Sequence, residues 1–236
     1  MLNPLKRLLK KQVETNKRLA AIGKLAAGVA HEIRNPLSSI KGFATYFGKR
    51  YRENEADKET AHIMVKEVER INRSITQLLE FAKPLSVEKT RVNIKEMIDH
   101  SLKLVHQDLI QKQIETKVII ESQNHVIYTD GDRMNQVLLN LYINAIAALD
   151  YKGILEIKVE DTADQGQIEI QVSDNGMGMD GKTLDLIFDP YFTTRSSGTG
   201  LGLSIVYRII ENLGGHIRVE SKKGRGTSFI INLPVS

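Results

Sequence analysis

A histidine, a glutamate and an asparagine lie close together in His31-Glu32-Ile33-Arg34-Asn35-Pro36, where apolar residues recur at helical spacing. At about 100° per residue, His31 is roughly 180° from the apolar stripe that includes Ile22, and Asn35 shares its face. An exposed imidazole beside a carboxylate can be a nucleophile, because Glu32 can accept one ring proton and leave the other nitrogen free to attack. Taken alone, the segment is more simply explained by an ordinary surface histidine.

Two asparagines share one face of a helix predicted over residues 133–149. Asn140 and Asn144 are four residues apart within the segment 132–145, which puts both amides on the same side of the helix. Their oxygens could bind Mg²⁺ and their amides a phosphate. Capped or solvated asparagines are the simpler alternative.

An acidic residue and two glycines follow a predicted strand in Asp174-Asn175-Gly176-Met177-Gly178. A carboxylate at the end of a strand can accept a hydrogen bond from an exocyclic amine such as that of adenine. The glycines, Gly176 and Gly178, allow the backbone to approach a flat ring. A plain turn is the alternative for this segment on its own.

A second glycine-rich segment contains Gly198, Gly200 and Gly202 and leads into a helix predicted over residues 204–213. Its amides and the helix N-terminus could bind phosphate. It does not fit G-x-G-x-x-G, because the third glycine comes one residue early. Residues 176–183 formally match a P-loop, but we reject that motif because the predicted strands pair as local hairpins and not as parallel βαβ units.

The elements that must position these residues fall into two groups. Apolar residues at 3/4 spacing predict a helix up to about Phe43, kinked or broken at Pro36. The polar segment 50–57 reads as a turn, and a second helix follows with a heptad-like seam. This predicts a helical hairpin, and two hairpins are expected to pair as a dimeric four-helix bundle. The seam consists of Met64, Val68, Ile71, Ile75, Leu78 and Ala82.

The remainder of the chain predicts an α/β sandwich, in which an antiparallel-rich sheet carries helices on one face. Alternating segments at 154–160 and 167–173 form an expected antiparallel pair, and 216–221 with 227–233 a final hairpin. Helices are expected over 94–113, 133–149 and 204–213, and further strands over 117–121 and 125–129.

The composition narrows the possible classes of protein. The 236 residues contain no cysteine, which excludes disulfides and thiolate chemistry. No signal peptide or membrane span is apparent. The chain has a net charge of +4, but residues 1–19 alone hold six basic residues and one acidic residue, a net of +5, which leaves −1 on the rest. That segment is a solvated helical linker, a juxtamembrane segment attracted to anionic lipid or a nucleic-acid contact, and we expect no nucleic-acid surface on the rest.

In their order and spacing, these motifs resemble those of sensor histidine kinases of two-component systems, over about residues 20–236. A final glycine turn, residues 224–229, fits the same family. The resemblance implies a dimerisation and histidine phosphotransfer hairpin followed by an ATP-binding domain of the Bergerat fold. The matching boxes are H at residues 31–36, N at 132–145, G1 at 174–178, F at 187–195 and G2 at 198–203.

The resemblance also implies roles for individual residues. His31 would be the phosphoacceptor, Glu32 its acid/base, and Asn35 would position water in a phosphatase reaction. Arg195 would reach the transferring phosphoryl group, and residues 179–197 would form a mobile lid over ATP. For Mg-ATP, Asn144 would ligate Mg²⁺, Asn140 would lie near the phosphates, Asp174 would bind the adenine amine with support from Thr227, and Gly176, Gly178, Gly198, Gly200 and Gly202 would shape the site.

The family pattern has one departure here. Ala147 stands where many relatives have a basic residue three positions after the Mg²⁺ asparagine, so one phosphate contact is missing or comes from elsewhere, for example from Lys182. The expected domains are a basic linker helix at 1–19, the hairpin at 20–84, a linker at 85–90 and the ATP-binding domain at 91–236.

The resemblance implies a homodimer that phosphorylates an aspartate of a response-regulator receiver domain, with a reverse phosphatase activity. It places the catalytic portion in the cytoplasm, with any membrane anchor in segments beyond this sequence. The glycine-rich run near residue 200 is similar to that of Bacillus-type sporulation kinases, which would add a sporulation phosphorelay and a protein inhibitor of the hairpin. Two alternatives are an ATPase or serine kinase that needs no histidine, and a non-catalytic scaffold or dedicated phosphatase.

Overall fold

The computed structural model describes residues 33–51, 53–82, 85–162, 166–195 and 198–236. Two compact units are present. One comprises Met1–Pro84 with Thr194–Leu201, and the other comprises Leu85–Thr193 with Gly202–Ser236. His31 and Glu32 lie outside the described residues, so the roles expected for them stay predictions.

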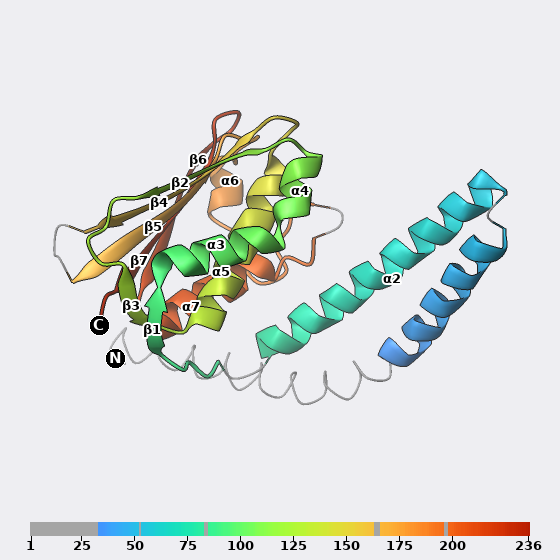
Figure 1. The fold of residues 1–236 in the computed structure, drawn as a ribbon, viewed down its shortest axis with the longest axis horizontal. Helices are drawn as coiled ribbons and strands as arrows, with labels where there is room; N and C mark the ends of the chain where they lie inside the picture. The colour runs from blue at the N-terminus through green and yellow to red at the C-terminus, as the bar shows by residue number, and fades with distance from the viewer. Residues whose placement is uncertain (1–32, 52, 83–84, 163–165, 196–197) are drawn as a thin grey trace, which may run out of the picture. The chain divides into compact units, whose positions relative to one another are not determined.

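The first unit contains a hairpin of two helices, one over residues 33–50 and the other α2 (Glu55–Ala82) (Figure 1). Asn54 begins α2, because its Oδ1 accepts the backbone N–H of Ala56 at 3.1 Å, as residues at a helix N-terminus commonly do. The Lys41 ammonium donates to Glu69 across the hairpin at 2.7 Å. Among the residues of the hairpin whose burial the structure describes, the buried apolar ones are Leu37, Ala44, Ala61 and Val68.

The predicted apolar seam of α2 is only partly buried within one chain. Val68 is buried, whereas Met64 and Ile71 are 43% and 39% exposed. A single hairpin offers α2 one neighbouring helix, so a seam wider than that contact leaves part of its apolar surface uncovered. The helix over residues 33–50 runs without interruption through Pro36, and the turn in which this proline would remove a hydrogen bond begins outside the described residues.

The second unit is a layered α/β structure built on a five-stranded sheet in the order β2-β4-β5-β7-β6. Buried and half-buried residues alternate along β4 and β5, as expected for strands with one face on the core. The strands are β2 (Glu115–Ile120), β4 (Ile154–Asp161), β5 (Gln167–Asp174), β6 (His216–Lys222) and β7 (Gly226–Pro234).

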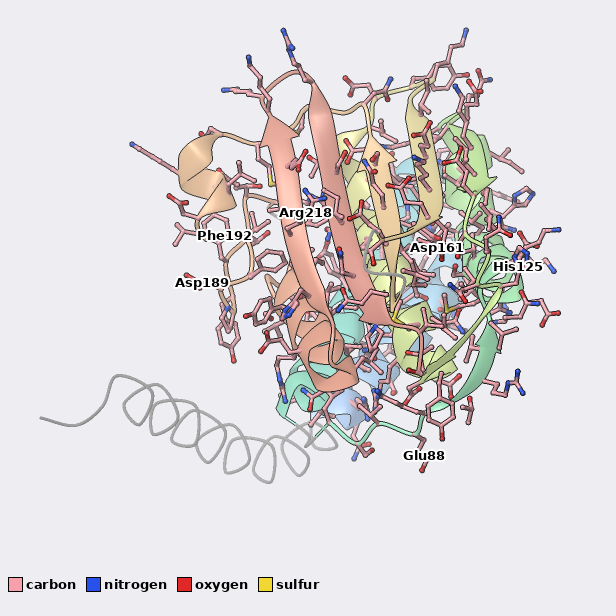
Figure 2. All side chains as sticks on the ribbon, turned by 90° about the vertical axis from the view of Figure 1, so that its left-hand side faces the viewer. Glu88, His125, Asp161, Asp189, Phe192 and Arg218 are labelled. Carbon is pink, nitrogen blue, oxygen red and sulfur yellow. The ribbon has the colours of Figure 1, made fainter. Side chains whose placement is uncertain are left out.

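Three helices cover one face of this sheet (Figure 1). They are α3 (Ile94–Leu104), α5 (Gly131–Ala148) and α7 (Gly202–Leu213), while α4 (His106–Gln111) and α6 (Gly181–Leu184) are short. The opposite face carries polar side chains and is uncovered in Figure 2, where Arg218 projects from it. The α/β sandwich with helices on one face is therefore confirmed.

Three details differ from the sequence predictions. The helix predicted over 94–113 is two helices, because the backbone leaves the helical region at the buried Val105, with φ −107° and ψ 5°. The predicted strand at 125–129 is β3 (Val126–Thr129), which pairs outside the main sheet with an unpredicted strand, β1 (Thr90–Asn93). The strand predicted at 117–121 is β2, which begins two residues earlier, and its parallel pairing with β4 was not predicted.

Within the described ranges, no helix is both long enough and apolar enough to cross a bilayer.

Candidate functional site: a nucleotide site on the sandwich

Helix α5 carries the two asparagines singled out in the sequence. It begins at Asp130, whose carboxylate accepts the backbone N–H of Arg133 at 3.0 Å. Its apolar side packs on the sheet and on α3 and α7, whereas Asn140 and Asn144 are only half-buried. The Asn140 amide donates to the backbone carbonyl of Gln136 at 2.8 Å. Helix α5 therefore presents two amide side chains on one face.

The turn after β5 is held against the C-terminal end of the same helix. The backbone N–H of Met177 donates to the carbonyl of Ala148 at 3.1 Å, and Ala148 is four residues beyond Asn144 on α5. Within the turn, Oδ1 of Asp174 accepts the N–H of Gly176 at 2.8 Å. An alanine at Gly176 would place its Cβ 2.5 Å from the Ala148 carbonyl oxygen, so this close approach requires glycine.

Two further glycines join the turn after β5 to the turn between β6 and β7. Gly178 has φ +61°, and a Cβ there would lie 2.1 Å from the carbonyl oxygen of Lys222. Gly226 has φ +93°, and its Cβ would lie 1.9 Å from the carbonyl oxygen of Asp174. Both positions combine a left-handed backbone with direct backbone contact, which leaves no room for a side chain. The structure thus interlocks two turns that are far apart in sequence.

Thr227 lies next to Asp174 in this arrangement, while the support expected from it for the adenine contact stays a prediction. The two residues are directly opposite each other in the β5–β7 register, and Thr227 is 6% exposed. Ser221, on the other side of Thr227 in β6, contacts it through hydroxyl oxygens 3.0 Å apart. Sequence reasoning missed Ser221, because a serine in a predicted strand carries no chemical signal of its own.

The glycines of the second glycine-rich segment divide between the two units. Gly202 begins α7, and a Cβ there would lie 3.0 Å from Oδ1 of Asn140. Arg195, Gly198 and Gly200 belong to Thr194–Leu201, which groups with the helical hairpin. The structure therefore brings Gly202 to Asn140, while the roles expected of the other three stay predictions.

The segment between the two glycine motifs contains α6 and the F box. Asp180 begins α6, and its carboxylate accepts the backbone N–H of Thr183 at 2.8 Å. Hydrogen bonds from the backbone and side chain of Thr183 lower the pKa of Asp180, and the charge of Lys223 makes a smaller contribution in the same direction. Phe188 packs against Tyr207 of α7 with ring centroids 5.5 Å apart. In Figure 2, Asp189 and Phe192 lie beyond the β6 edge of the sheet.

The topology also tests the rejected P-loop motif. The strand before it, β5, is antiparallel to both of its neighbours, β4 and β7. A P-loop follows a strand of a parallel βαβ unit, so this segment is not one.

Behind the site, Tyr142 of α5 is fully buried beside Ser101 of α3, with a 3.5 Å contact between their hydroxyl oxygens. Burial raises the pKa of Tyr142 to about 12, partly opposed by the bond to Ser101. The phenol is therefore neutral at physiological pH and serves packing. In the hairpin unit, Asn35 is exposed, in agreement with the solvent-facing position expected from helical geometry.

These features fit a bound purine nucleotide with a hard divalent cation. Asp174 is oriented by its own turn, and Gly176 leaves the backbone of that turn free of a side chain. Asn140 and Asn144 supply neutral amides, whose oxygens are suitable ligands for Mg²⁺ and whose N–H groups can donate to phosphate. No group of three or more acidic or histidine side chains that could hold a metal occurs in the described part of the chain. A cation here would consequently depend on the nucleotide for most of its ligands.

Comparison with known proteins agrees with this geometry. The model described as histidine kinase-, DNA gyrase B- and HSP90-like ATPase matches residues 129–236, and that of the His Kinase A (phospho-acceptor) domain matches residues 21–86. Both motif-based domain types predicted from the sequence are therefore confirmed.

Relatives over nearly the whole chain are sensor kinases. Sensor histidine kinase ZraS of Escherichia coli (strain K12) is 43% identical over 231 residues, 98% of this chain and 49% of ZraS. Sporulation kinase A of Bacillus subtilis (strain 168) is 35% identical over 220 residues, 93% of this chain and 36% of that protein. The chain thus spans about half the length of the curated relatives it matches, or less, and the higher identity to ZraS does not favour the sporulation branch.

Solved structures of histidine kinase ThkA resemble the chain as well. Its catalytic domain is 33% identical, with a TM-score of 0.57 over 63% of this chain and 96% of that domain. ThkA in complex with response regulator protein TrrA is 30% identical, with a TM-score of 0.71 over 97% of this chain and 66% of that one. The chain therefore belongs to the sensor histidine kinases of two-component systems, and contains their phosphoacceptor and ATP-binding regions.

Proposed function

We propose that this chain uses Mg-ATP to phosphorylate His31 and then passes the phosphoryl group to an aspartate of a response-regulator receiver domain. The observation that carries the ATP-binding half is the interlock of the turn after β5 with the turn between β6 and β7, where Asp174 and Thr227 are opposite each other in the strand register. The N–H of Met177 ties this region to Ala148, four residues beyond Asn144 on α5. The phosphoacceptor half rests on the His31-Glu32 sequence and on membership of the family.

In this reaction, Nε2 of His31 attacks the γ-phosphorus, the bond from phosphorus to the β,γ-bridging oxygen breaks, and ADP leaves. The Glu32 carboxylate accepts the imidazole proton. Such transfers need mainly positioning and charge stabilisation, and Asn144 is the residue we assign to a Mg²⁺ ion that would neutralise phosphate charge. Arg195, Gly198 and Gly200 are assigned to the γ-phosphate end, and Asn35 to the water of a reverse phosphatase reaction.

The test is incubation of the full chain with γ-labelled Mg-ATP, comparing His31→Gln with a matched control, His62→Gln. His62 is an exposed histidine of α2. The expected label is acid-labile and base-stable, is retained in the His62 variant and is absent from the His31 variant. ATP turnover that is indifferent to His31 would support an ATPase or serine kinase instead.

The functional unit we propose is a homodimer. Ile40, Phe47, Met64 and Ile71 of the hairpin are all exposed in one chain, and a second hairpin would cover them in a four-helix bundle. Met64→Glu should shift the chain toward the monomer in sedimentation, whereas Lys66→Glu, on an exposed polar position of α2, should not. A Met64 variant that sediments as a dimer would contradict this arrangement.

The receiver domain is the partner we propose for phosphotransfer, supported by the complex of ThkA with a response regulator protein. Mixing labelled chain with a receiver domain should move the label from an acid-labile to a base-labile form. Sporulation signalling, a protein inhibitor of the hairpin and a membrane anchor in the whole protein stay predictions.

A further inference from the structure

Three polar side chains form a row across β5, β7 and β6. The strand register sets Asp174 opposite Thr227, and Thr227 opposite Ser221. All three lie on the helix-covered face of the sheet, because they share the parity of buried residues such as Val172 and Phe229. Asp174 and Thr227 already have a proposed role in binding the base, whereas Ser221 has none.

The hydroxyl of Ser221 is surrounded by three partners whose hydrogen-bonding capacities differ. Its Oγ lies 2.9 Å from the carbonyl oxygen of Gly226, which can only accept, and 2.9 Å from the backbone nitrogen of Met179, which can only donate. The third partner is Oγ1 of Thr227, at 3.0 Å. A hydroxyl has one proton and two lone pairs, and the Ser221 proton goes to Gly226.

This count decides the direction of the bond between the two hydroxyls. Because Ser221 donates its proton to the Gly226 carbonyl and accepts the N–H of Met179, it can form a hydrogen bond with Thr227 only by accepting one from the Thr227 hydroxyl. Thr227 then has no proton to offer elsewhere, and its remaining lone pairs make it an acceptor toward its other side. Next to it stands the Asp174 carboxylate, which is also an acceptor when ionised.

We propose that Ser221 is a positioning residue for base selection. Its hydroxyl accepts the hydrogen bond of the Thr227 hydroxyl, so that the site offers only hydrogen-bond acceptors to the edge of the base. This rests on the proposed ATP-binding function. An adenine presents an exocyclic amine to such an edge, whereas a guanine presents a carbonyl oxygen that would meet lone pairs. The bond from Met179 also ties the start of the segment after the G1 turn to the same hydroxyl.

The test measures the affinities of the full chain for ATP and GTP, with Mg²⁺, by displacement of a fluorescent ATP analogue. Ser221→Ala should lower the ATP-to-GTP preference by about tenfold, since Thr227 regains a proton that it can donate to a carbonyl. Ser221→Thr keeps the hydroxyl and should retain the preference. The matched control is Ser228→Ala, whose hydroxyl meets Ser173 on the opposite face of the sheet at 2.8 Å, and it should change neither affinity.

The outcomes separate this inference from the proposed function. A wild-type chain that binds neither nucleotide would contradict the proposed function itself. ATP binding in the wild type, with Ser221→Ala weakening ATP and GTP equally or not at all, would overturn the role of Ser221 alone, because a merely structural serine has no reason to distinguish the bases. If the alanine variant does not fold, Ser221→Cys carries the test: its thiol is a weak acceptor, so an unchanged preference would equally overturn the proposal.

Discussion

Lys112 should be an important stabilising contact of the helix that carries the candidate site. The last carbonyls of a helix lack partners within it, and at the end of α5 the Lys112 ammonium donates to the carbonyl oxygens of Ile146 and Leu149, each at 2.7 Å. The carbonyl of Ala145 accepts the N–H of Leu149, and that of Ala148 accepts Met177. Replacing Lys112 by methionine keeps most of the unbranched side chain, which becomes one atom shorter, and removes both bonds.

The expected loss follows from the kind of bond. A hydrogen bond to a charged group contributes about 1.5–3 kcal/mol, and a cation near a helix C-terminus about 0.3–1 kcal/mol. Because Lys112 is only half-buried, water can replace part of this. We therefore expect Lys112→Met to cost about 2 kcal/mol, which for a unit of this size lowers Tm by about 4–8 °C.

The assay is thermal unfolding of the full chain with and without Mg-ATP. The unfolding transition whose Tm is raised by ATP is that of the ATP-binding unit, since a ligand stabilises only the unit that binds it. Lys117→Met is the matched control, because Lys117 is an exposed lysine 3.7 Å from Glu115, and such surface pairs contribute about 0–1 kcal/mol. Equal shifts for the two variants would refute the assignment of Lys112 as a cap.

Three further predictions concern other described contacts. Hydrogen bonds from the loop after β2 lower the pKa of Asp161 in the folded protein. The ionised carboxylate therefore stabilises the fold fully above its unfolded-state pKa of about 3.9, and this stabilisation is lost as the pH falls through the lower folded-state pKa. The Tm difference between the wild type and Asp161→Asn should accordingly shrink below about pH 4. Gly226→Ala should lower the free energy of unfolding in urea by on the order of 3 kcal/mol or more, because its Cβ would clash with backbone. Gly224→Ala, at φ +75° in open space, should lower it by only about 1–2 kcal/mol. Similar losses for the two variants would argue against a backbone clash at Gly226. A double-mutant cycle on Lys41 and Glu69, each about half exposed, should give a coupling of no more than about 1 kcal/mol, and a larger one would show that the pair is not solvent-screened.

The parts of the fold that could be predicted are those whose pattern is local. Strict alternation identified β4 and β5 to within one residue, because a strand with one buried face repeats every two residues. Helix α5 was anticipated because a long apolar-rich segment with helical periodicity has few alternatives. The Asp174–Gly178 segment was recognisable for a similar reason, since glycines at fixed spacing after a strand are uncommon outside turns and binding loops.

The parts that could not be predicted depend on partners distant in sequence. β1 has four residues and pairs with β3, more than thirty positions away, so its own sequence contains no sign of the pairing. The parallel pairing of β2 with β4 is equally non-local. Ser221 is the clearest case at the site, because its importance arises only from three partners that the fold brings to one hydroxyl.

The same distant contacts explain why binding and stability should be coupled here. The C-terminal carbonyls of α5 receive hydrogen bonds from Lys112 and from Met177, and Met177 belongs to the turn that orients Asp174. Loosening the last turn of the helix therefore also releases the carboxylate proposed to hold the base. A nucleotide that requires Asp174 in place must in turn favour the ordered helix end, so ATP affinity and local protection of α5 against hydrogen exchange should fall together in Lys112→Met. Loss of one without the other would show that the cap and the base site are independent.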